Sequence, residues 1–420
     1  MTLKLISHPV REVALGPTTQ FVAGLLTVSE SDARRLFSHP ALDDVRISWV
    51  SPGESARIVK VLDAVEPRAK GPSSGGIMFP GFLGSSTTQG RGETHRLAGV
   101  SVITAGFLPR AQEAVIEMSG DARAASPFGE LHNLVVEFKP TADAAWDKVD
   151  AALRVGLLKL AAFLGEAALT DRRGTMEILN DPPILAPKGN NLPAIGTITN
   201  LQTQGTFKDV FVYGRSFGDS APTLIDPSEI EDGAVVSGQY GHPSLKNPTY
   251  MHQNHPVVRA LRARDGKDLR FAGVVLAPEP VQAEAKESVA LATAKLCKTA
   301  GFAGVVITKE GGGNADADIS LKIDALADLG IPSVGIFAEL AGPLGTAPSL
   351  VVPPEKGTAL ISTGNYDEVL QLPKVDRALG GATIDLVSAS ATDALELPTA
   401  AIYCSLSPLG AGLLTCREVA

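Results

Sequence analysis

The histidine-rich segment 240–256 is the stretch of this sequence best suited to chemistry. It reads YGHPSLKNPTYMHQNHP and holds three of the chain's seven histidines, His242, His252 and His255, together with Ser244. Imidazoles exchange protons near neutral pH, and a serine hydroxyl can act as a nucleophile. The segment lacks the apolar periodicity of a helix or a strand, so we expect an ordered loop. The alternative is a polar linker whose histidines are solvated.

A metal site in this segment is a further interpretation. Zinc takes three or four protein ligands, which the three histidines and a carboxylate could supply, although no HExxH-type spacing is present. The three cysteines, Cys297, Cys404 and Cys416, form no CxxC pair and are too few for a disulfide framework. We therefore expect a reducing, cytoplasmic location, and the identity of any metal stays open.

Ser244 has a chemical possibility of its own. A serine or cysteine side chain can attack the carbonyl that precedes it and convert the amide into an ester. β-Elimination then breaks the chain and leaves a dehydroalanine, which hydrolyses to an N-terminal pyruvoyl group, an electrophile for amines. Such chemistry needs a strained loop and a nearby acid or base, and His242 lies two residues away. The alternative is a serine that only forms a turn.

Polar loops follow three predicted strands in the second half of the chain. Ligands bind beyond the carboxyl ends of the strands in an open parallel sheet, so we expect these loops to meet at one site. Their candidate binding residues are Glu310, Gly311, Gly312, Gly313, Asn314, Asp316, Glu339, Ser362, Thr363 and Asn365. The carboxylates favour a cation, such as an ammonium group or a metal, over a phosphate. For Asp316 and Asp318 the alternative is the ordinary negative charge of a helix N-terminus.

Several classes of function are excluded by the sequence. The run Gly311-Gly-Gly-Asn314 is not a GxGxxG fingerprint, and no Gly-Lys-Ser/Thr follows it, which argues against nucleotide binding. The formal net charge of −9 argues against a general nucleic-acid binder. The chain contains no run of 18 apolar residues, so we expect no membrane span. Residues 1–10 lack the charged-then-apolar pattern of a signal peptide, so we expect none.

A chain of 420 residues is long for a single hydrophobic core, so we expect about two domains. Residues 1–235 are expected to form a β-rich α+β domain, and residues 236–256 the reactive loop. Strands are predicted at 46–50, 55–62, 97–104, 131–139, 195–199, 209–213 and 232–236. Helices are predicted at 29–37 and 142–166, the second from apolar residues at helical spacing.

Residues 257–420 are expected to form an α/β domain with a mainly parallel sheet. Strands at 271–276, 303–308 and 332–337 alternate with helices at 281–300 and 319–329, which implies right-handed crossovers. Further strands are predicted at 349–352, 359–362 and 400–404.

Short runs along nearly the whole chain resemble one family, the proprotein of component B (α/β subunits) of glycine, sarcosine and betaine reductases, which is related to the proline reductase proprotein. The runs are His8-Pro-Val-Arg-Glu12, Pro52-Gly-Glu-Ser-Ala-Arg-Ile-Val59, Asp63-Ala-Val-Glu-Pro-Arg68, Ser74-Gly-Gly-Ile-Met-Phe-Pro-Gly-Phe-Leu-Gly84, Gly92-Glu-Thr-His-Arg-Leu-Ala-Gly99, Met118-Ser-Gly120, Leu201-Gln-Thr-Gln-Gly205, Val212-Tyr-Gly214, Thr249-Tyr-Met-His-Gln-Asn-His-Pro256, Glu310-Gly-Gly-Gly-Asn314 and Ser362-Thr-Gly-Asn-Tyr366.

The resemblance implies a chain that is cut in its middle. In the family the new N-terminus carries a pyruvoyl group made from a cysteine, which binds the substrate amine. A selenol or thiol of a partner subunit then cleaves the C–N bond reductively. That cysteine precedes the Thr-Tyr-x-His-Gln-Asn run, at the position of Ser244, and it is absent here. Serine either replaces it as the precursor, or the chain stays uncut and Ser244 is a ligand.

The expected function is therefore that of an oxidoreductase of amino-acid metabolism. The chain would be the substrate-binding subunit of a two-component reductase, in a hetero-oligomer with a thiol- or selenol-bearing subunit. Protons or a metal would be handled by His242, His252 and His255, and the substrate's ammonium group would be held by Glu310, Asn314 and Asp316. The alternatives are an uncut metal- or acid–base-dependent lyase or hydrolase, and a non-catalytic scaffold subunit that docks the partner.

Overall fold

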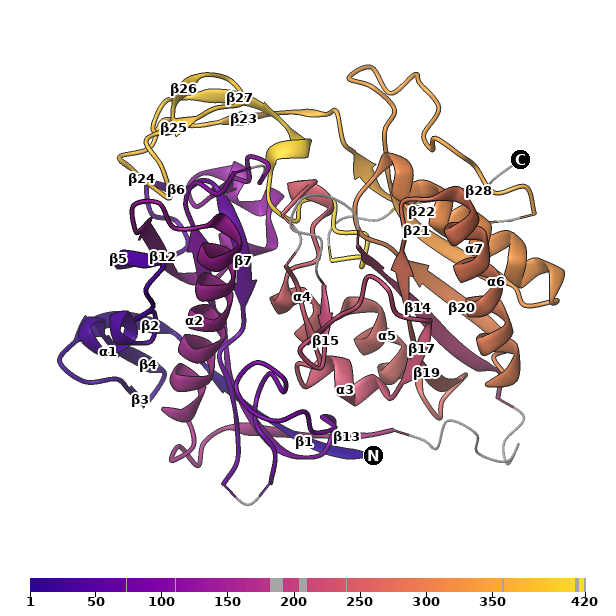
Figure 1. The fold of residues 1–420 in the computed structure, drawn as a ribbon, viewed down its shortest axis with the longest axis horizontal. Helices are drawn as coiled ribbons and strands as arrows, with labels where there is room; N and C mark the ends of the chain where they lie inside the picture. The colour runs from indigo at the N-terminus through magenta and orange to yellow at the C-terminus, as the bar shows by residue number, and fades with distance from the viewer. Residues whose placement is uncertain are drawn as a thin grey trace.

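The chain folds into two lobes that lie side by side (Figure 1). The structure, a computed structural model, describes residues 1–418 apart from 73, 110, 182–191, 204–209, 239, 357–358 and 412–414. Most of the N-terminal half forms one lobe, and most of the C-terminal half forms the other. The segment 240–256 runs between them, so the residues expected to do chemistry lie where the lobes meet.

The second lobe contains a seven-stranded sheet in the order β17-β19-β14-β20-β21-β22-β28. Its five central strands are parallel: β14 (Ala194–Gln202), β19 (Arg270–Glu279), β20 (Gly304–Thr308), β21 (Ser333–Glu339) and β22 (Ala359–Asn365). The sequence predicts a parallel sheet from β19, β20 and β21, but it assigns β14 to the N-terminal domain. Antiparallel strands β17 (Thr223–Ile225) and β28 (Thr415–Glu418) close the two edges. These central strands are mostly buried because helices cover both faces of the sheet.

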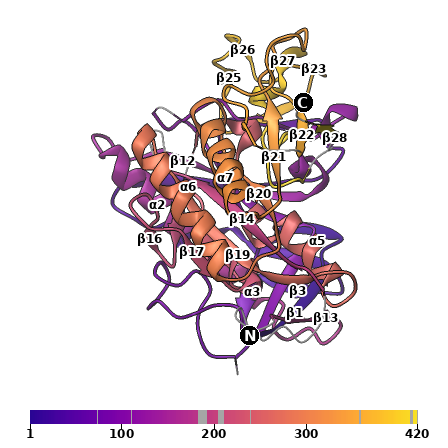
Figure 2. The same ribbon diagram turned by 90° about the vertical axis from the view of Figure 1, so that its right-hand side faces the viewer.

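Helices α6 (Ala283–Thr299) and α7 (Asp316–Asp328) pack on one face of the sheet. Figure 2 shows them side by side in front of the strands. Cys297 of α6 and Ile319 of α7 share a buried core with Ile198 of β14. The other face is covered by α5 (Pro256–Arg264), whose apolar side chains pack in a separate core. Among the described residues, no helix combines the length and apolar character needed to cross a membrane.

The first lobe consists of small sheets around the long helix α2 (Trp146–Glu166). Leu157 and Leu160 of α2 share a core with Val102 and Leu134. The strands of this lobe are β1 (Thr2–Pro9), β2 (Glu12–Gly16), β3 (Gln20–Val22), β4 (Leu25–Ser29), β5 (Leu42–Val50), β6 (Ala56–Ile58), β7 (Val61–Val65), β8 (Arg68–Lys70), β9 (Gly92–Ala98), β10 (Val100–Ala105), β11 (Ile116–Glu117), β12 (His132–Pro140) and β13 (Thr175–Asn180). Helix α1 (Glu30–Arg35) begins where the side chain of Ser29 accepts the Asp32 N–H.

Two predicted strands are each divided in the structure. The segment 97–104 splits at Gly99, whose φ of +89° turns the chain from β9 into β10 of a different sheet. The segment 55–62 splits at Lys60, whose φ of +53° separates β6 from β7. Apolar residues continue to alternate through both bends. The sequence pattern therefore predicts one continuous strand at each place.

Three other predictions on local structure are wrong. The segment 349–352 is irregular, and 399–401 is a short 3-10 helix, so neither predicted strand forms. The segment 240–256 is not a plain loop, because it contains the 3-10 helix η3 (Pro243–Leu245) and helix α4 (Thr249–Gln253) before α5 begins. Proline opens η3 and directly precedes α4, positions where the missing N–H and fixed φ are tolerated.

The sheets draw strands from both sides of the boundary expected near residue 235. Strand β14 lies in the middle of the second lobe's sheet. Conversely, β24 (Arg377–Leu379) pairs with β6 of the first lobe, and β23 (Val369–Leu372) and β27 (Leu395–Pro398) lie above that lobe in Figure 1. The division into domains at residues 235 and 257 stays a prediction, and strands from both sides of this boundary pair within the same sheets.

Shorter elements connect these parts. They are β15 (Phe211–Val212), β16 (Arg215–Ser216), α3 (Pro227–Glu231), β18 (Val235–Val236), β25 (Thr383–Ile384) and β26 (Ala389–Ser390), with the 3-10 helices η1 (Asp121–Ala125), η2 (Pro127–Glu130), η4 (Gly313–Ala315) and η5 (Thr399–Ala401). The buried Arg57 fixes the returning C-terminal segment to the first lobe, because its guanidinium donates to the carbonyls of Pro373, Ala391 and Asp393.

Candidate active site

Ser244 is fully buried between the lobes, in η3. Its Oγ has no hydrogen-bond partner among the described residues. A distant part of the chain holds this turn in place, because the Leu406 N–H donates to the Ser244 carbonyl at 3.0 Å. A buried hydroxyl without a partner is unusual in a folded protein, which makes Ser244 a candidate for a chemical role.

The carbonyl of Pro243 lies next to this hydroxyl along the chain, and two backbone N–H groups point at its oxygen. They belong to Cys404, at 2.9 Å, and to Lys246, at 3.3 Å. Paired N–H groups of this kind stabilise negative charge on a carbonyl oxygen when a nucleophile adds to its carbon. The preceding residue, His242, has a φ of +48°, a left-handed conformation that strains a residue with a β-carbon.

Charged side chains surround the turn. Lys246 and Glu310 are buried and electrostatically coupled, and Asp63 accepts hydrogen bonds from the N–H and the hydroxyl of Thr249 at 3.1 and 2.7 Å. Lys246 Nζ donates to Ser237 Oγ at 2.6 Å. Burial raises the pKa of Glu310 to about 7, although Lys246 acts in the opposite direction. Burial also lowers the pKa of Lys246.

His252 and His255 are fully buried, so the interpretation of this segment as a solvated polar linker is wrong. Burial lowers the pKa of each to about 3, which keeps both rings neutral at neutral pH. The His255 Nε2 lies 2.9 Å from Thr199 Oγ1, and its Nδ1 accepts the Val258 N–H, which caps α5. Both ring nitrogens of His252 lack a hydrogen-bond partner within the described part of the chain.

His242 lies at the edge of the site rather than inside it. Its backbone N–H donates to Gln112 Oε1 at 2.6 Å, and its ring centroid lies 6.3 Å from that of Tyr366. Burial lowers the pKa of its imidazole as well. The proton-handling role expected of the three histidines stays a prediction, and neutral buried rings do not favour it.

The glycine-rich loop after β20 packs directly on the serine turn. The Gly311 N–H donates to the Leu245 carbonyl at 3.3 Å. A β-carbon at Gly311 would lie 2.5 Å from Gln202 Nε2, and one at Gly312 would lie 2.9 Å from Leu245 Cδ1. Gly311 also has a φ of +71°, and the crowding at Gly311 comes from β14 whereas that at Gly312 comes from the serine turn. The loop also brings Glu310 to this segment, where Glu310 Oε1 accepts the Asn247 N–H at 3.0 Å.

The other residues expected in this loop lie elsewhere. Asp316 is buried in an ion pair with Lys309, and Asp318 is paired with Lys286. Asn314 is exposed at the surface. The structure thus brings Glu310 to the segment that contains Ser244, through Asn247, whereas the carboxylate of Asp316 is already neutralised by a lysine.

The polar residues at the carboxyl ends of β21 and β22 bond mainly to neighbouring segments. Ser362 donates to Glu339 at 2.5 Å, and Asn365 donates to the Gly342 carbonyl at 2.8 Å. Thr363 donates to the Leu406 carbonyl at 2.9 Å. Because the Leu406 N–H in turn holds the Ser244 carbonyl, Thr363 connects the sheet to the serine turn.

Buried polar atoms without partners gather around the carboxyl ends of β14, β19 and β20. Among the described residues they are Asn200 Nδ2 and Oδ1, Gln202 Oε1, Ser244 Oγ, both ring nitrogens of His252, Glu279 Oε1 and Oε2, and Glu310 Oε2. More than about nine in ten buried polar groups in proteins find a partner. Burial also raises the pKa of Glu279 well above its usual range. This concentration is typical of a site that completes its hydrogen bonds with water or a ligand.

Sequence reasoning missed several of these residues, namely Asp63, Asn200, Gln202, Lys246, Glu279 and Cys404. Polar residues at the ends of apolar strands were a usable signal for Asn200, Gln202 and Glu279. The backbone of Cys404 contacts Pro243, and the neighbouring Ser407–Asn247 hydrogen bond joins residues that are 160 positions apart in the sequence. No local sequence pattern predicts a contact between such distant segments. Within the described chain no three His, Cys, Asp or Glu side chains could hold a metal together, so the zinc interpretation finds no support.

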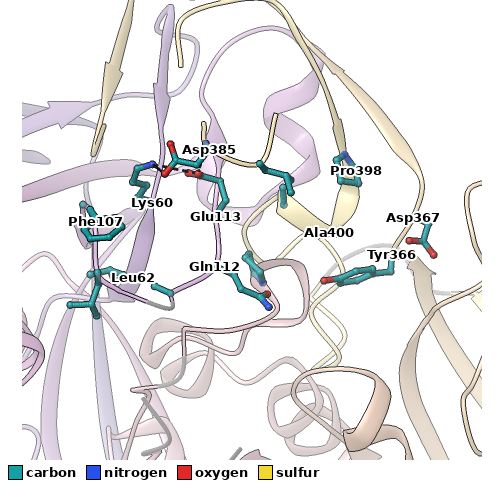
Figure 3. A pocket seen from close by; sticks show the side chains of 16 residues that line it. Lys60, Leu62, Phe107, Gln112, Glu113, Tyr366, Asp367, Asp385, Pro398 and Ala400 are labelled. Atoms are coloured by element: carbon teal, nitrogen blue, oxygen red, sulfur yellow. Dashed lines mark hydrogen bonds and ion pairs between the residues drawn. The ribbon is translucent and has the colours of Figure 1, made fainter. Parts of the chain in front are cut away.

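A cavity of about 540 Å³ opens beside Pro243 (Figure 3). Gln112 and Tyr366, which both contact His242, line it. Small molecules could therefore approach the serine turn from this side.

Comparison with known proteins gives one consistent result. The family model described as glycine/sarcosine/betaine reductase component B subunits matches residues 1–411. Component B subunits alpha and beta of the glycine reductase complex from Acetoanaerobium sticklandii are 33% identical, over 99% of this chain and 100% of theirs. The sarcosine reductase component B subunit alpha from Peptoclostridium acidaminophilum is 33% identical, over 90% of this chain and 89% of its own. No solved structure matches the chain.

Proposed function

Since this chain belongs to the family of glycine/sarcosine/betaine reductase component B subunits, we propose that it is the substrate-binding subunit of a reductase complex. The relatives are named as components of glycine, sarcosine and betaine reductase complexes. By analogy, this chain would hold a small amine while a thiol or selenol of a partner subunit cleaves its C–N bond reductively. Ser244 would first be converted into the reactive group by self-cleavage of the chain.

The geometry around the Pro243–Ser244 bond is the observation that carries this proposal. The hydroxyl that must attack is buried without a partner among the described residues. The carbonyl oxygen that must accept negative charge already receives N–H groups from Cys404 and Lys246. The left-handed backbone at His242 adds strain directly before the bond that breaks. The Lys246 N–H makes the ordinary hydrogen bond of a 3-10 turn, but a serine that only forms a turn needs neither the second donor from Cys404 nor a buried hydroxyl without a described partner.

The proposed steps balance without an external oxidant. Ser244 Oγ adds to the Pro243 carbonyl carbon, the C–N bond breaks, and the amine nitrogen takes the hydroxyl proton, which leaves an ester. Loss of the Ser244 α-proton and cleavage of the Cβ–Oγ bond then release a carboxylate on Pro243 and a dehydroalanine at 244. Water adds and ammonia leaves, so the new N-terminus carries a ketone.

We assign the transfer of the Ser244 α-proton to Lys246, a buried residue two positions along the chain. Burial lowers the pKa of its ammonium group, so a neutral Nζ that accepts a proton is more accessible than for an exposed lysine. Glu310, with a pKa of about 7, is poised to exchange protons near neutral pH. Cys404 contributes its backbone N–H, because burial raises the pKa of its thiol well above the usual range and leaves it unreactive.

The residues present fit a pyruvoyl group at position 244. When formed, that group supplies an electrophilic carbonyl for an amine. The orphaned polar atoms of Gln202, His252 and Glu310 surround the turn and would bind the polar groups of a substrate. The cavity beside Pro243 gives the amine an approach.

Carbonyl labelling of the purified full chain tests this proposal. A hydrazide reagent should label a fragment that begins at residue 244 in the wild type. Ser244→Ala should abolish the labelling, and Ser244→Cys should retain it, because a thiol performs the same acyl shift. Ser101→Ala is a matched control, since Ser101 is equally buried but lies in β10. Labelling of Ser244→Ala at the wild-type level would contradict the proposal.

A further inference from the structure

A second cavity, of about 510 Å³, lies where the first lobe's sheet of β1, β9 and β13 meets helix α5. The described residues that line it are Leu5, Arg96, Glu177, Ile178, Leu179, Asn180, Glu231, Arg259, Arg262, Ala263 and Asp265. Cavities of roughly 300–1,000 Å³ hold small ligands, so the size of this one admits a ligand. Three of its lining residues are arginines, two of them from α5 and one from β9.

Three guanidinium groups gather on one neutral oxygen beside this cavity. Asn254 Oδ1 accepts a hydrogen bond from each of Arg259 at 2.6 Å, Arg96 at 3.1 Å and Arg68 at 3.2 Å. The carboxylate next to them is Glu66, which lies 2.5 Å from Arg68 and 3.9 Å from Arg96. Like charges repel at such short range, so one carboxylate leaves positive charge at this place without a counter-charge.

Arg259 carries that unbalanced charge. It forms no ion pair with any described residue, and its one described side-chain hydrogen bond is to the Asn254 amide. Burial lowers the pKa of its guanidinium, and the neighbouring Arg96 and Arg68 lower this pKa further. A guanidinium nevertheless stays charged in proteins. Charges withdrawn from water are normally paired, so Arg259 lacks the partner that its position calls for.

The remaining N–H groups of two arginines are open for a ligand. Arg259 Nε and Nη1, and Arg96 Nη2, form no hydrogen bond with any described residue. None of these three atoms is among the fully buried side-chain atoms that lack a partner, so each has accessible surface. Both side chains line the cavity. Because they share the Asn254 oxygen, their guanidinium groups lie close enough to bind one oxyanion together.

The other charges of the cavity favour an anion with a single charge. Arg262 is already neutralised, since it pairs with Glu231 at 2.7 Å and with Asp181 at 3.0 Å. Glu177 is exposed, so solvent screens its charge. Asp265 accepts a backbone N–H at 2.7 Å. These carboxylates oppose the second charge of a phosphate more than the single charge of a carboxylate.

We propose that this cavity binds a small monocarboxylate that carries a short hydrocarbon chain. The carboxylate accepts N–H groups from Arg259 and Arg96 and supplies the counter-charge that Arg259 lacks. The hydrocarbon chain lies along the apolar part of the lining, formed by Leu5, Ile178 and Leu179. No step at residue 244 takes part, so the inference stands or falls independently of the proposed function.

Isothermal titration calorimetry on the purified full-length protein tests this site. The probes are butyrate, butylamine, which has a similar chain but the opposite charge, and inorganic phosphate. We expect butyrate to bind at least about tenfold more tightly than either of the others. Arg259→Gln should weaken butyrate about tenfold, because a charge-assisted pair is lost. Arg96→Gln should weaken it too, which tests the same cavity from the first lobe.

Arg264→Gln is the matched control. It removes an arginine from the same helix, but the Arg264 side chain is 62% exposed and pairs with Asp268, so butyrate binding should not change. Circular dichroism checks that each variant is folded. The inference is overturned if the wild type does not bind butyrate, or if phosphate or butylamine binds as tightly. It is also overturned if folded Arg259→Gln or folded Arg96→Gln binds butyrate as the Arg264→Gln control does.

Discussion

The hydroxyl of Ser244 occupies a position that a folded chain normally avoids, buried and without a partner among the described residues. Leaving a hydroxyl in such a place costs about 1–3 kcal/mol. The adjoining carbonyl has two N–H donors at the same time. At the scale of single residues, the structure therefore arranges a nucleophile and a polarised carbonyl side by side.

Cys404 should act through its backbone and not through its thiol. Its φ is +60°, which glycine adopts without strain, and its N–H donates to Pro243. We expect Cys404→Gly to retain self-cleavage at close to the wild-type extent, measured as the fraction of chain in two fragments. A loss of cleavage in Cys404→Gly, with the protein still folded by circular dichroism, would assign a role to the thiol instead.

Glu310 should make stability depend on pH. Burial raises its pKa from 4.5 to about 7, so the folded chain binds this proton more tightly than the unfolded chain. Its contribution to stability is therefore fully present below pH 4.5 and lost as the pH rises through 7, by roughly 3 kcal/mol. Glu310→Gln should flatten this part of the pH profile.

Thermal unfolding at pH 5 and at pH 8 measures the effect of Glu310→Gln. The variant should gain stability relative to the wild type at the higher pH, because no buried carboxylate must ionise. Glu284→Gln, at an exposed position, should follow the wild type at both values. Identical pH profiles for Glu310→Gln and the wild type would mean that Glu310 is not held in a buried, proton-binding state.

At the scale of elements, the glycine-rich loop and η3 are fitted closely to each other. Gly311 and Gly313 both have φ near +70°, but a β-carbon at Gly311 would meet Gln202, whereas one at Gly313 would meet nothing within 4 Å. Comparing alanine substitutions at Gly311 and Gly313 therefore separates the cost of the left-handed backbone from the cost of crowding. Crowding by Gln202, the last residue of β14, therefore acts at Gly311 in addition to the left-handed backbone.

Gly311→Ala should therefore cost more stability than Gly313→Ala. Both substitutions place a β-carbon on a left-handed backbone, which costs about 1–2 kcal/mol. The added contact with Gln202 should raise the cost at Gly311 by about a further 1 kcal/mol. Urea unfolding of the two variants measures the difference. Equal midpoints would show that Gln202 moves aside freely and that crowding at Gly311 adds nothing to the cost of the left-handed backbone.

At the scale of the whole molecule, buried polar contacts join the lobes. Arg68 of β8 is fully buried, and its guanidinium pairs with Glu66 and donates to the carbonyls of Glu231 and Gln253. A lysine has the charge but not the planar fork of donors. The lobes are thereby held around the segment that carries Ser244.

Arg68→Lys should destabilise the protein by about 3 kcal/mol, because several buried acceptors lose their donor. Differential scanning calorimetry should show a lower Tm. Arg35→Lys is the control, since the Arg35 side chain is 72% exposed and pairs only at the surface. A change for Arg68→Lys no larger than that for Arg35→Lys would refute the role of Arg68 in joining the lobes.

Much of the local structure could be predicted from the sequence. Helices α2, α6 and α7 and the parallel direction of β19, β20 and β21 followed from the period of apolar residues and from short connections. The placement of β24 beside β6, and of Cys404 beside Pro243, could not be predicted. These contacts join distant segments, and apolar periodicity carries no information about which distant partner a segment meets.

Some residues of the candidate site could be predicted from the sequence, and others could not. Ser244 and Glu310 were expected on chemical grounds, and the structure brings them to one buried cluster. Burial of His252 and His255 was not expected, because a polar composition usually indicates exposure. Lys246 lies in the same segment but has no distinctive motif, and its significance appears only once Glu310 and Asp63 are seen close to it.

Intact mass of the purified full chain under denaturing conditions tests the central claim most directly. The account predicts two fragments, comprising residues 1–243 and 244–420, with the second blocked to N-terminal sequencing by its ketone. Ser244→Ala should give one species of 420 residues. A single wild-type species of full length, both alone and after incubation with the partner reductase subunits of a relative, would contradict self-cleavage at Ser244 and the function built on it.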